Sequence, residues 1–581
     1  MIPKTPKFEA AINEILNDLK PHKKNCKQCG VVFDVFAEDI EFYKKFQVPE
    51  PTLCPDCRIQ RRFGYRVTFF PIFYKRNCDA PDHKEKIISF YSQENKIKVY
   101  DDEHYFSGKW DGLEFGIDYD FNKSFFEQFH NLNMSAPHQS LFHDPQSVNC
   151  DYVISGVSAK NCYYASNPYF SENIYYTATA TYSRDCIDVG ETDSCEQCYE
   201  GVYTLRCYNC KFCYWSSNCL DSAFLYNCRN CSHCFGCVNL WNKEYYFFNQ
   251  RLTEDEYKLK IKEINLGKRT VLNRYKKMFE EMVKTAVNKN VNNIKTENSL
   301  GDTLNNCKNC FYTFRIVGKS KGNENLRYYI YGDDVNYSMD AFGAAHIAYS
   351  YESTGLIWAN NMKFCAMIRT GLEMEYCIEC NNCEHCFGSV GLKNKKYCIF
   401  NKQYPPDEYW RLVDDIKSAM LKNGEYGEFF PLNHSPFNYN DSNAFIHFPL
   451  SKEEILKNNW HFEEKKESII DLARFTVLQP KEVPDDISDV SDDILKSTII
   501  CEETGKPFLI TDFELKFYRK HNLPLPTVHP LQRIKNRFSL IRPFRLWQYP
   551  CSKCGETMHS SLDPAKKLIV YCEQCYREEV V

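Results

Sequence analysis

The chain has 581 residues, which suggests roughly three or four domains. Its net charge of −5 creates no overall positive field that would attract nucleic acid. Its 31 cysteines occur without an export signal or a membrane-spanning apolar run, which favours a cytoplasmic location, no membrane contact, and metal ligands or buried thiols over disulfides.

The chain is predicted to begin with an amphipathic helix over residues 1–22, followed by a zinc knuckle module over 23–68. In this module the pairs Cys26/Cys29 and Cys54/Cys57 flank a predicted hairpin and a short helix. Four thiolates complete a tetrahedral zinc site and leave no open position, so we expect a structural ion. Residues 69–110 are predicted to form a degenerate zinc ribbon that keeps only Cys78, and 111–145 form a connector.

The middle of the chain contains two related halves, predicted over 146–265 and 297–425, with a helical linker over 266–296. Residues 228–257 align with 380–409 at an offset of 152, with 17 identities in 30 positions. Short aromatic and β-branched runs with few Gly or Pro residues favour stacked coils over hairpins. We therefore predict a mainly β fold with two tandem parallel β-helix-like halves and a few helices; an antiparallel sandwich is the alternative.

Many cysteines of the two halves are spaced by three residues. This spacing is compatible with internal ladders of small buried thiols, with additional zinc, or with an iron–sulfur cluster. The replacement of Cys237 by Ser389 between the repeats favours ladders, because an essential ligand would be lost. The runs are Cys207, Cys210, Cys213 and Cys219; Cys228, Cys231, Cys234 and Cys237; and Cys377, Cys380, Cys383 and Cys386.

After a connector over 426–498, the C-terminal part repeats the N-terminal modules. Residues 501–538 align with 26–63 at an offset of 475, with 14 identities in 38 positions. The predicted knuckle module over 499–545 is degenerate, because Cys501, Thr504, His529 and Gln532 replace the four cysteines. The zinc ribbon over 546–581 is intact, so two structural zinc ions are predicted in total. Its ligands are Cys551, Cys554, Cys572 and Cys575.

The motif "CKQCGVVF…EFYKKFQVPEPTLCPDCRIQRR" resembles a probable zinc-ribbon domain of bacteria and archaea. With the cysteine-rich repeats and the motifs "FNKQYPPDEY", "CEETGKPF" and "YCEQCY", nearly the whole chain is similar to uncharacterised zinc-ribbon proteins of ultrasmall bacteria. The resemblance implies zinc binding by the first knuckle module, and it implies no established activity.

Two basic stretches, 58–76 and 533–545, contain no acidic residue and alternate with aromatic residues. Positive charge beside aromatic rings suits contact with phosphates and bases. The alternative is that the arginines pair with acids on the β-helix. The candidate nucleic-acid contacts are Arg58, Arg61, Arg62, Arg66, Arg533, Lys535, Arg537 and Arg542.

Together these patterns predict a zinc-stabilised, non-enzymatic binding scaffold, with nucleic acid or a ribonucleoprotein as the favoured ligand. The sequence contains none of the motifs typical of a P-loop, a dinucleotide-binding site, a zincin or a nucleophile elbow. One alternative is a cytoplasmic carbohydrate-active β-helix enzyme, and the other is a scaffold that binds only proteins. The carboxylates of the enzyme alternative are Asp185, Asp188, Glu191 and Asp193.

Overall fold

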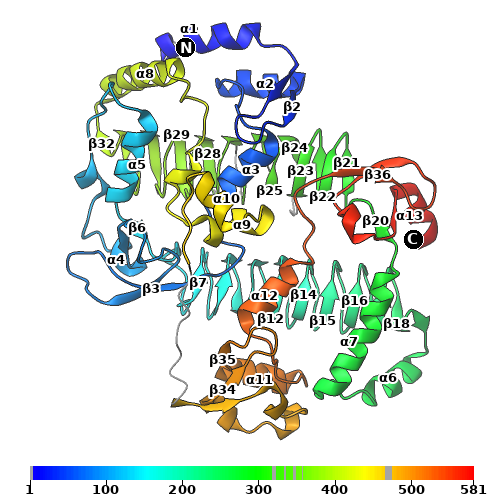
Figure 1. The fold of residues 1–581 in the computed structure, drawn as a ribbon. Coiled ribbons are helices and arrows are strands. Elements are labelled where there is room, and N and C mark those ends of the chain that lie inside the picture. The colour runs from blue at the N-terminus through cyan, green and yellow to red at the C-terminus, as the bar shows by residue number, and fades with distance from the viewer. Residues whose placement is uncertain are drawn as a thin grey trace.

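Two stacks of short strands form the body of the chain (Figure 1). The computed structural model describes residues 4–316, 322–332, 335–343, 348–355, 358–464 and 474–580. In both stacks neighbouring strands are parallel except for the last pair, so the chain is strand-rich with parallel sheets, as predicted. The first stack contains β10 (Glu172–Tyr175), β12 (Arg184–Gly190), β14 (Tyr199–Val202), β15 (Lys211–Tyr214), β16 (Ala223–Tyr226), β17 (Ser232–Val238), β18 (Glu244–Phe247) and β19 (Gln250–Arg251). The second contains β21 (Ile294–Glu297), β22 (Leu300–Lys308), β23 (Phe311–Ile316), β24 (Asn323–Arg327), β25 (Ile330–Gly332), β26 (Asn336–Met339), β27 (Ala348–Tyr351), β28 (Trp358–Lys363), β29 (Thr370–Glu375), β30 (Cys383–Phe387), β31 (Lys396–Ile399) and β32 (Lys402–Gln403).

Successive layers of the first stack are related by an offset of 12 residues, and so are those of the second stack from β24 onward, whereas its earlier layers have offsets from 11 to 16 residues. In the first stack Tyr199 pairs with Lys211, and Lys211 pairs with Ala223. In the second stack Tyr351 pairs with Lys363 in the same way. Another parallel sheet of the first stack keeps the same offset, and its strands are β9 (Pro168–Tyr169), β11 (Ala180–Thr181) and β13 (Thr192–Asp193).

The layers turn at residues with left-handed backbone conformation. Between residues 155 and 245, most residues at every third position have positive φ, for example 52° at Asn161 and 56° at Asn173. Asn and Asp tolerate this region better than most residues, and here their side chains also bond the next layer. Asn161 donates to Asn173 at 3.3 Å, and Asn173 donates to Asp185 at 2.7 Å. The residue that follows most of these turns is buried, as at Cys162 and Ile174.

The central cysteines lie inside the stacks. Those of the first stack form one buried cluster with small apolar residues, and those at the end of the second stack form another. The Cys198 thiol, for example, is 3.5 Å from the carbonyl oxygen of Glu196 in its own layer and 3.6 Å from that of Cys207 in the next. Among the described residues, neither of the two groups that could hold a metal ion includes a central cysteine. This is the arrangement that the ladder interpretation predicts.

Helices cover the outside of the stacks. The N-terminal helix α1 packs on α8, and α7 covers the first stack, where its Phe279 ring lies 5.7 Å from that of Phe224. No helix in the described part of the chain is both long enough and apolar enough to cross a membrane. The α-helices outside the two terminal units are α1 (Pro6–Asp18), α4 (Asp102–Phe106), α5 (Phe125–Ser135), α6 (Glu254–Lys262), α7 (Arg269–Lys284), α8 (Pro406–Lys422), α9 (Asn443–His447) and α10 (Lys452–Lys457).

The two terminal units share one succession of elements: a hairpin, two helices and a second hairpin. Figure 1 shows α3 of the N-terminal unit against the second stack and α12 of the C-terminal unit against the first stack. The second helix of each unit therefore packs on the stack that is more distant in the sequence. The N-terminal unit contains β1 (His22–Asn25), β2 (Val32–Val35), α2 (Ala37–Phe46), α3 (Pro55–Phe63), β3 (Tyr74–Asn77) and β4 (Lys86–Ser89). The C-terminal unit contains β34 (Ser497–Ile500), β35 (Pro507–Leu509), α11 (Asp512–Lys520), α12 (Pro530–Phe538), β36 (Trp547–Pro550), β37 (Thr557–Ser560), β38 (Val570–Tyr571) and α13 (Glu573–Val580).

Candidate metal centres and candidate binding pocket

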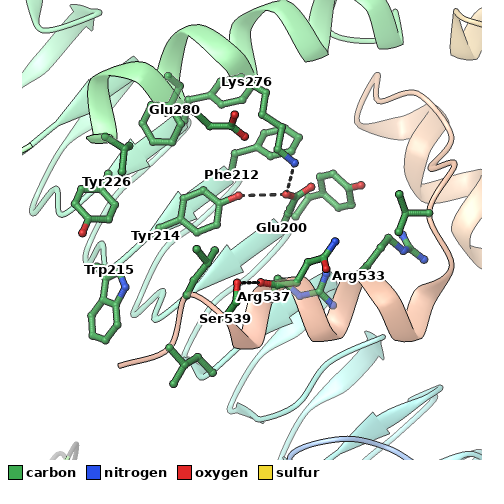
Figure 2. A pocket seen from close by; sticks show the side chains of 18 of the residues that line it. Glu200, Phe212, Tyr214, Trp215, Tyr226, Lys276, Glu280, Arg533, Arg537 and Ser539 are labelled. Atoms are coloured by element: carbon green, nitrogen blue, oxygen red, sulfur yellow. Dashed lines mark hydrogen bonds and ion pairs between the residues drawn. The ribbon is translucent and has the colours of Figure 1, made fainter. Parts of the chain in front are cut away.

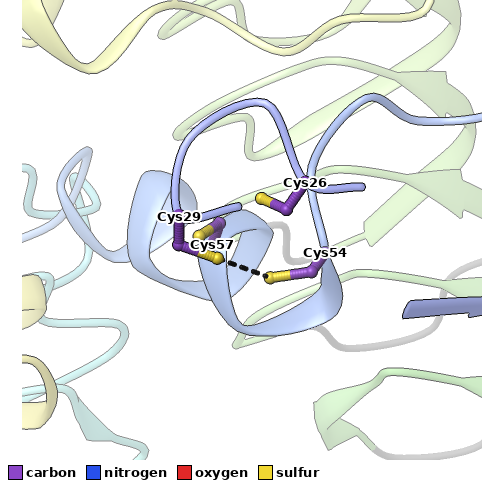
Figure 3. Close-up of side chains that lie close together, drawn as sticks. All are labelled: Cys26, Cys29, Cys54 and Cys57. Atoms are coloured by element: carbon purple, nitrogen blue, oxygen red, sulfur yellow. Dashed lines mark hydrogen bonds between the residues drawn. The ribbon is translucent and has the colours of Figure 1, made fainter. Parts of the chain in front are cut away.

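Four cysteines of the N-terminal unit meet at the start of α3 (Figure 3). Cys26 and Cys29 lie in the β1–β2 turn, where Gly30 has a φ of 74° and donates its N–H to the Cys26 carbonyl at 3.0 Å. Cys54 is the N-cap residue of α3, and Cys57 lies in its first turn. All four sulfur atoms lie within 4.8 Å of one another, and those of Cys29 and Cys54 are 3.7 Å apart.

A second group of four cysteines closes the C-terminal ribbon. Cys551 and Cys554 lie in the β36–β37 turn, and Cys572 and Cys575 flank the start of α13. Their sulfur atoms also lie within 4.8 Å of one another, and those of Cys554 and Cys572 are 3.8 Å apart. Both predicted metal-ligating sets are therefore brought together.

Both groups fit a tetrahedral ion with sulfur ligands. Zinc–sulfur bonds of about 2.3 Å in a tetrahedron place neighbouring sulfurs about 3.8 Å apart, which matches the two distances above. At the C-terminal group burial raises the pKa of Cys551, but backbone N–H groups of Cys554 and Cys572 outweigh this effect and lower it to about 6. A low pKa favours the thiolate that a metal requires. Each group can thus hold one metal ion through four protein ligands.

The degenerate modules use the corresponding positions for protein hydrogen bonds. Cys501 accepts a hydrogen bond from the backbone N–H of His529 at 3.2 Å. The His529 ring itself caps α12 by accepting from the backbone N–H of Leu531 at 3.1 Å. In the N-terminal ribbon Cys78 accepts from the backbone N–H of Asp101 at 3.4 Å. Within the described part of the chain, neither module contains a metal-binding group.

We expect the purified chain to contain two zinc ions, one for each four-cysteine group. Elemental analysis of the full chain measures this number directly. The double variant Cys29→Ser/Cys54→Ser is expected to lose one ion, and Cys554→Ser/Cys572→Ser the other. A content of about four zinc ions or more, or stoichiometric iron, would show that central cysteines bind metal.

The arginines predicted as nucleic-acid contacts in the first stretch point into the protein. Arg58 Nε lies 2.7 Å from an oxygen of Asp340, and Arg62 Nη1 lies 3.2 Å from the other oxygen. Arg61 pairs with Glu352 at 2.7 Å and with a second carboxylate, that of Glu428, at 2.8 Å. Arg58, Arg61 and Arg62 are buried in α3. Arg66 is also buried, and its guanidinium donates to Thr68 and Asn167.

The second stretch is arranged in the same way on the first stack. Arg533 and Arg537 of α12 both pair with Asp188; the Arg537 contact is 2.8 Å long. Arg542 pairs instead with Asp302 of β22, in the second stack, at 3.5 Å, and all three arginines are buried. Lys535 alone among the eight predicted nucleic-acid contacts is exposed. The other seven residues are arginines, and protein partners enclose their guanidinium groups. This is the arrangement expected if the arginines pair within the chain and do not contact phosphates.

These contacts are repeated between the two halves of the molecule. The offset of 475 relates Arg58 to Arg533, and the offset of 152 relates Asp188 to Asp340. In each terminal unit an arginine at the equivalent position thus pairs with an acid at the equivalent position of the stack that is more distant in the sequence. The two offsets were visible in the sequence, but the acid that receives each arginine was missed.

The carboxylates considered for an enzyme do not share one groove. Asp188 is covered by the α12 arginines, and Glu191 is buried beside Arg315 and Tyr331. Asp185 accepts from Asn173 in the column of asparagines. At these three positions the carboxylates form ion pairs or hydrogen bonds with other side chains of the protein.

A pocket of about 610 Å³ opens between the first stack, α7, α12 and the C-terminal ribbon (Figure 2). On one side Lys276 of α7 lies 2.7 Å from Glu200, which also accepts from the Tyr214 hydroxyl at 3.2 Å. Burial opposes ionisation of Glu200, but Lys276 outweighs it and lowers the pKa of this carboxyl. No motif in the sequence marks this pocket, because its lining comes from separate segments. Its aromatic lining consists of Tyr199, Phe212, Tyr214, Trp215, Phe224, Tyr226 and Phe279.

Comparison of the chain with protein-family models, with curated proteins and with solved structures finds no match. The two four-cysteine groups are consistent with zinc-ribbon-like modules.

Proposed function

We propose that the chain is a zinc-stabilised, non-enzymatic binding scaffold built on two parallel β-helix halves. The 12-residue offset between layers and the buried columns of cysteines support the β-helix assignment. In this arrangement each layer buries its inner face only against its neighbours. The two terminal units then fix the halves relative to each other, because each unit packs on the distant stack.

Zinc is the ion that we assign to the two four-cysteine groups. Four thiolates suit zinc in a closed tetrahedral site, and such a site holds structure. When bound, the ion would tie the β1–β2 turn to the start of α3 and so hold the helix that carries Arg58. Cys26, Cys29, Cys54 and Cys57 would be its ligands there.

The pocket beside α7 is the ligand-binding site that the structure supports best, and this one observation carries the proposal. Its aromatic rings offer large apolar contact, and Glu200 with Lys276 forms a fixed polar wall. We propose a protein as the ligand. Nucleic acid is a weaker candidate, because seven of the eight basic side chains considered for phosphate contact are already enclosed by protein partners.

Affinity capture from native lysate, with and without nuclease, tests this function. We expect the immobilised chain to capture a protein whether or not nuclease is present. The variant Leu540→Asp, which places a charge on an exposed side chain at the pocket, should lose that protein. The matched variant Leu259→Asp, on α6 and outside the pocket, should retain it. Capture that disappears with nuclease would favour nucleic acid, and turnover of an oligosaccharide by the purified chain would favour the enzyme alternative.

A further inference from the structure

The pocket beside α7 has a counterpart on the second stack, and there the chain itself fills it. The repeat offsets relate pocket residues Phe212 and Phe224 of the first stack to Phe364 and Tyr376 of the second. They also relate three pocket residues of the C-terminal unit to the N-terminal unit. These pairs are Thr527 with Thr52, Asn536 with Arg61, and Leu540 with Tyr65.

In the second half, residues 426–430 lie between these counterparts. The Tyr426 ring is 6.0 Å from that of Phe364, and the Gly427 N–H donates to the Tyr376 hydroxyl at 3.0 Å. The Phe430 ring is 6.1 Å from that of Tyr376 and 5.8 Å from that of Tyr65. A segment that turns at Gly427, whose φ is 95°, therefore places its aromatic side chains between the strand face and α3.

The acid within this segment is held by the N-terminal unit. Glu428 accepts from Arg61 at 2.8 Å and from the Thr52 hydroxyl at 2.6 Å. On the other wall, Phe129 of α5 lies 4.6 Å from Phe430. The face of the strand stack, helix α3 and helix α5 thus enclose the segment on three sides.

The first half keeps the same three walls. Phe279 of α7 lies against Phe224 at 5.7 Å, as Phe125 of α5 lies against Tyr376 at 4.9 Å. Asn536 and Leu540 of the C-terminal unit complete the enclosure. Between these walls lies the cavity of about 610 Å³, a size within the range of ligand-binding pockets.

We propose that this pocket binds a segment of a partner protein that carries two consecutive aromatic residues preceded by an uncharged polar residue. The aromatic pair follows from the way Phe429 and Phe430 fill the matching groove. The uncharged residue follows from Asn536, which replaces Arg61 and donates to Glu503 at 3.1 Å. A glutamate placed like Glu428 would lie near Glu503, and position 536 offers no positive charge to neutralise it. The neighbouring Arg533 and Arg537 are already paired with Asp188. This inference rests on the proposed function and names the chemistry of its ligand.

Fluorescent peptides with the sequence of residues 424–432 test the proposal, with either Gln or Glu at the position of Glu428. Fluorescence anisotropy with the full chain should show saturable binding of the Gln peptide, about tenfold tighter than that of the Glu peptide. The variant Asn536→Arg should reverse this preference, because it restores the charge of Arg61. A peptide with Ala in place of Tyr426, Phe429 and Phe430 should not bind.

The variants used for lysate capture test whether the peptides bind in this pocket. Leu540→Asp should abolish binding of both peptides, and Leu259→Asp should leave it unchanged. The inference is overturned if neither peptide binds saturably, if Leu540→Asp binds as the unchanged chain does, or if Asn536→Arg leaves the preference as it was. Loss of peptide binding with retained, Leu540-dependent capture of a protein would overturn this inference alone and leave the proposed function standing.

Discussion

Replacing Asp340 with asparagine is expected to lower the free energy of unfolding by about 3–5 kcal/mol. Asp340 is fully buried, and its two oxygens face Arg58 and Arg62, which are at most 1% exposed. Burial lowers the pKa of Arg62, and the charge of Asp340 opposes that effect. Without the carboxylate, two guanidinium groups remain in the interior and share only Glu352, which is already paired with Arg61, and this costs far more than the loss of one surface ion pair.

Thermal and urea denaturation measure the effect, with Glu254→Gln as the control. The Glu254–Lys258 pair is exposed and spans one helical turn, so its loss should cost less than about 0.5 kcal/mol. The triple variant Arg58→Met/Arg62→Met/Asp340→Leu should recover much of the stability, because it removes all three buried charges together. Equal unfolding midpoints for Asp340→Asn and Glu254→Gln would contradict the structural role of these arginines. Asp188→Asn should act in the same way through Arg533 and Arg537.

The metal-binding groups could be predicted from the sequence because their signal is local. A CxxC pair fixes two ligands in one turn, and the following Gly30 permits the positive φ that the turn needs. The strand-rich core could also be predicted, from short aromatic runs without hairpin residues. The 12-residue offset between layers is also visible in the sequence, as the spacing of Asn149, Asn161 and Asn173, but it was not predicted.

The partners of the arginines could not be predicted, because pairing depends on burial and on contacts between distant segments. Arg58 and Asp340 are 282 residues apart, and nothing near Arg58 in the sequence points to that acid. A run of arginines and aromatic rings fits phosphate contact and internal pairing equally well until burial is known. The pocket could not be predicted from the sequence for a similar reason, since Glu200, Lys276 and Asn536 belong to three separate segments.

Replacing Cys29 with serine is expected to destabilise the second stack rather than the first, although the first is nearer in the sequence. A structural zinc ion contributes about 10–16 kcal/mol in isolated zinc fingers, so the knuckle module should open when a ligand is lost. Opening removes α3, and with it Arg58 and Arg61, from Asp340 and Glu352. These acids would then lie in a strand stack that has lost their counter-charges.

Hydrogen exchange followed by mass spectrometry locates the change. In Cys29→Ser, faster exchange is expected over residues 23–68 and in β26–β29, with little change in β12–β16. The matched variant Cys572→Ser should act elsewhere, on the C-terminal ribbon and on Asn288, whose N–H donates to the Ile569 carbonyl at 2.8 Å. Faster exchange of the first stack in Cys29→Ser, with an unchanged second stack, would contradict the crosswise arrangement. Removal of zinc by a chelator should reproduce both patterns together, because each ion holds a unit that is packed on a different part of the body.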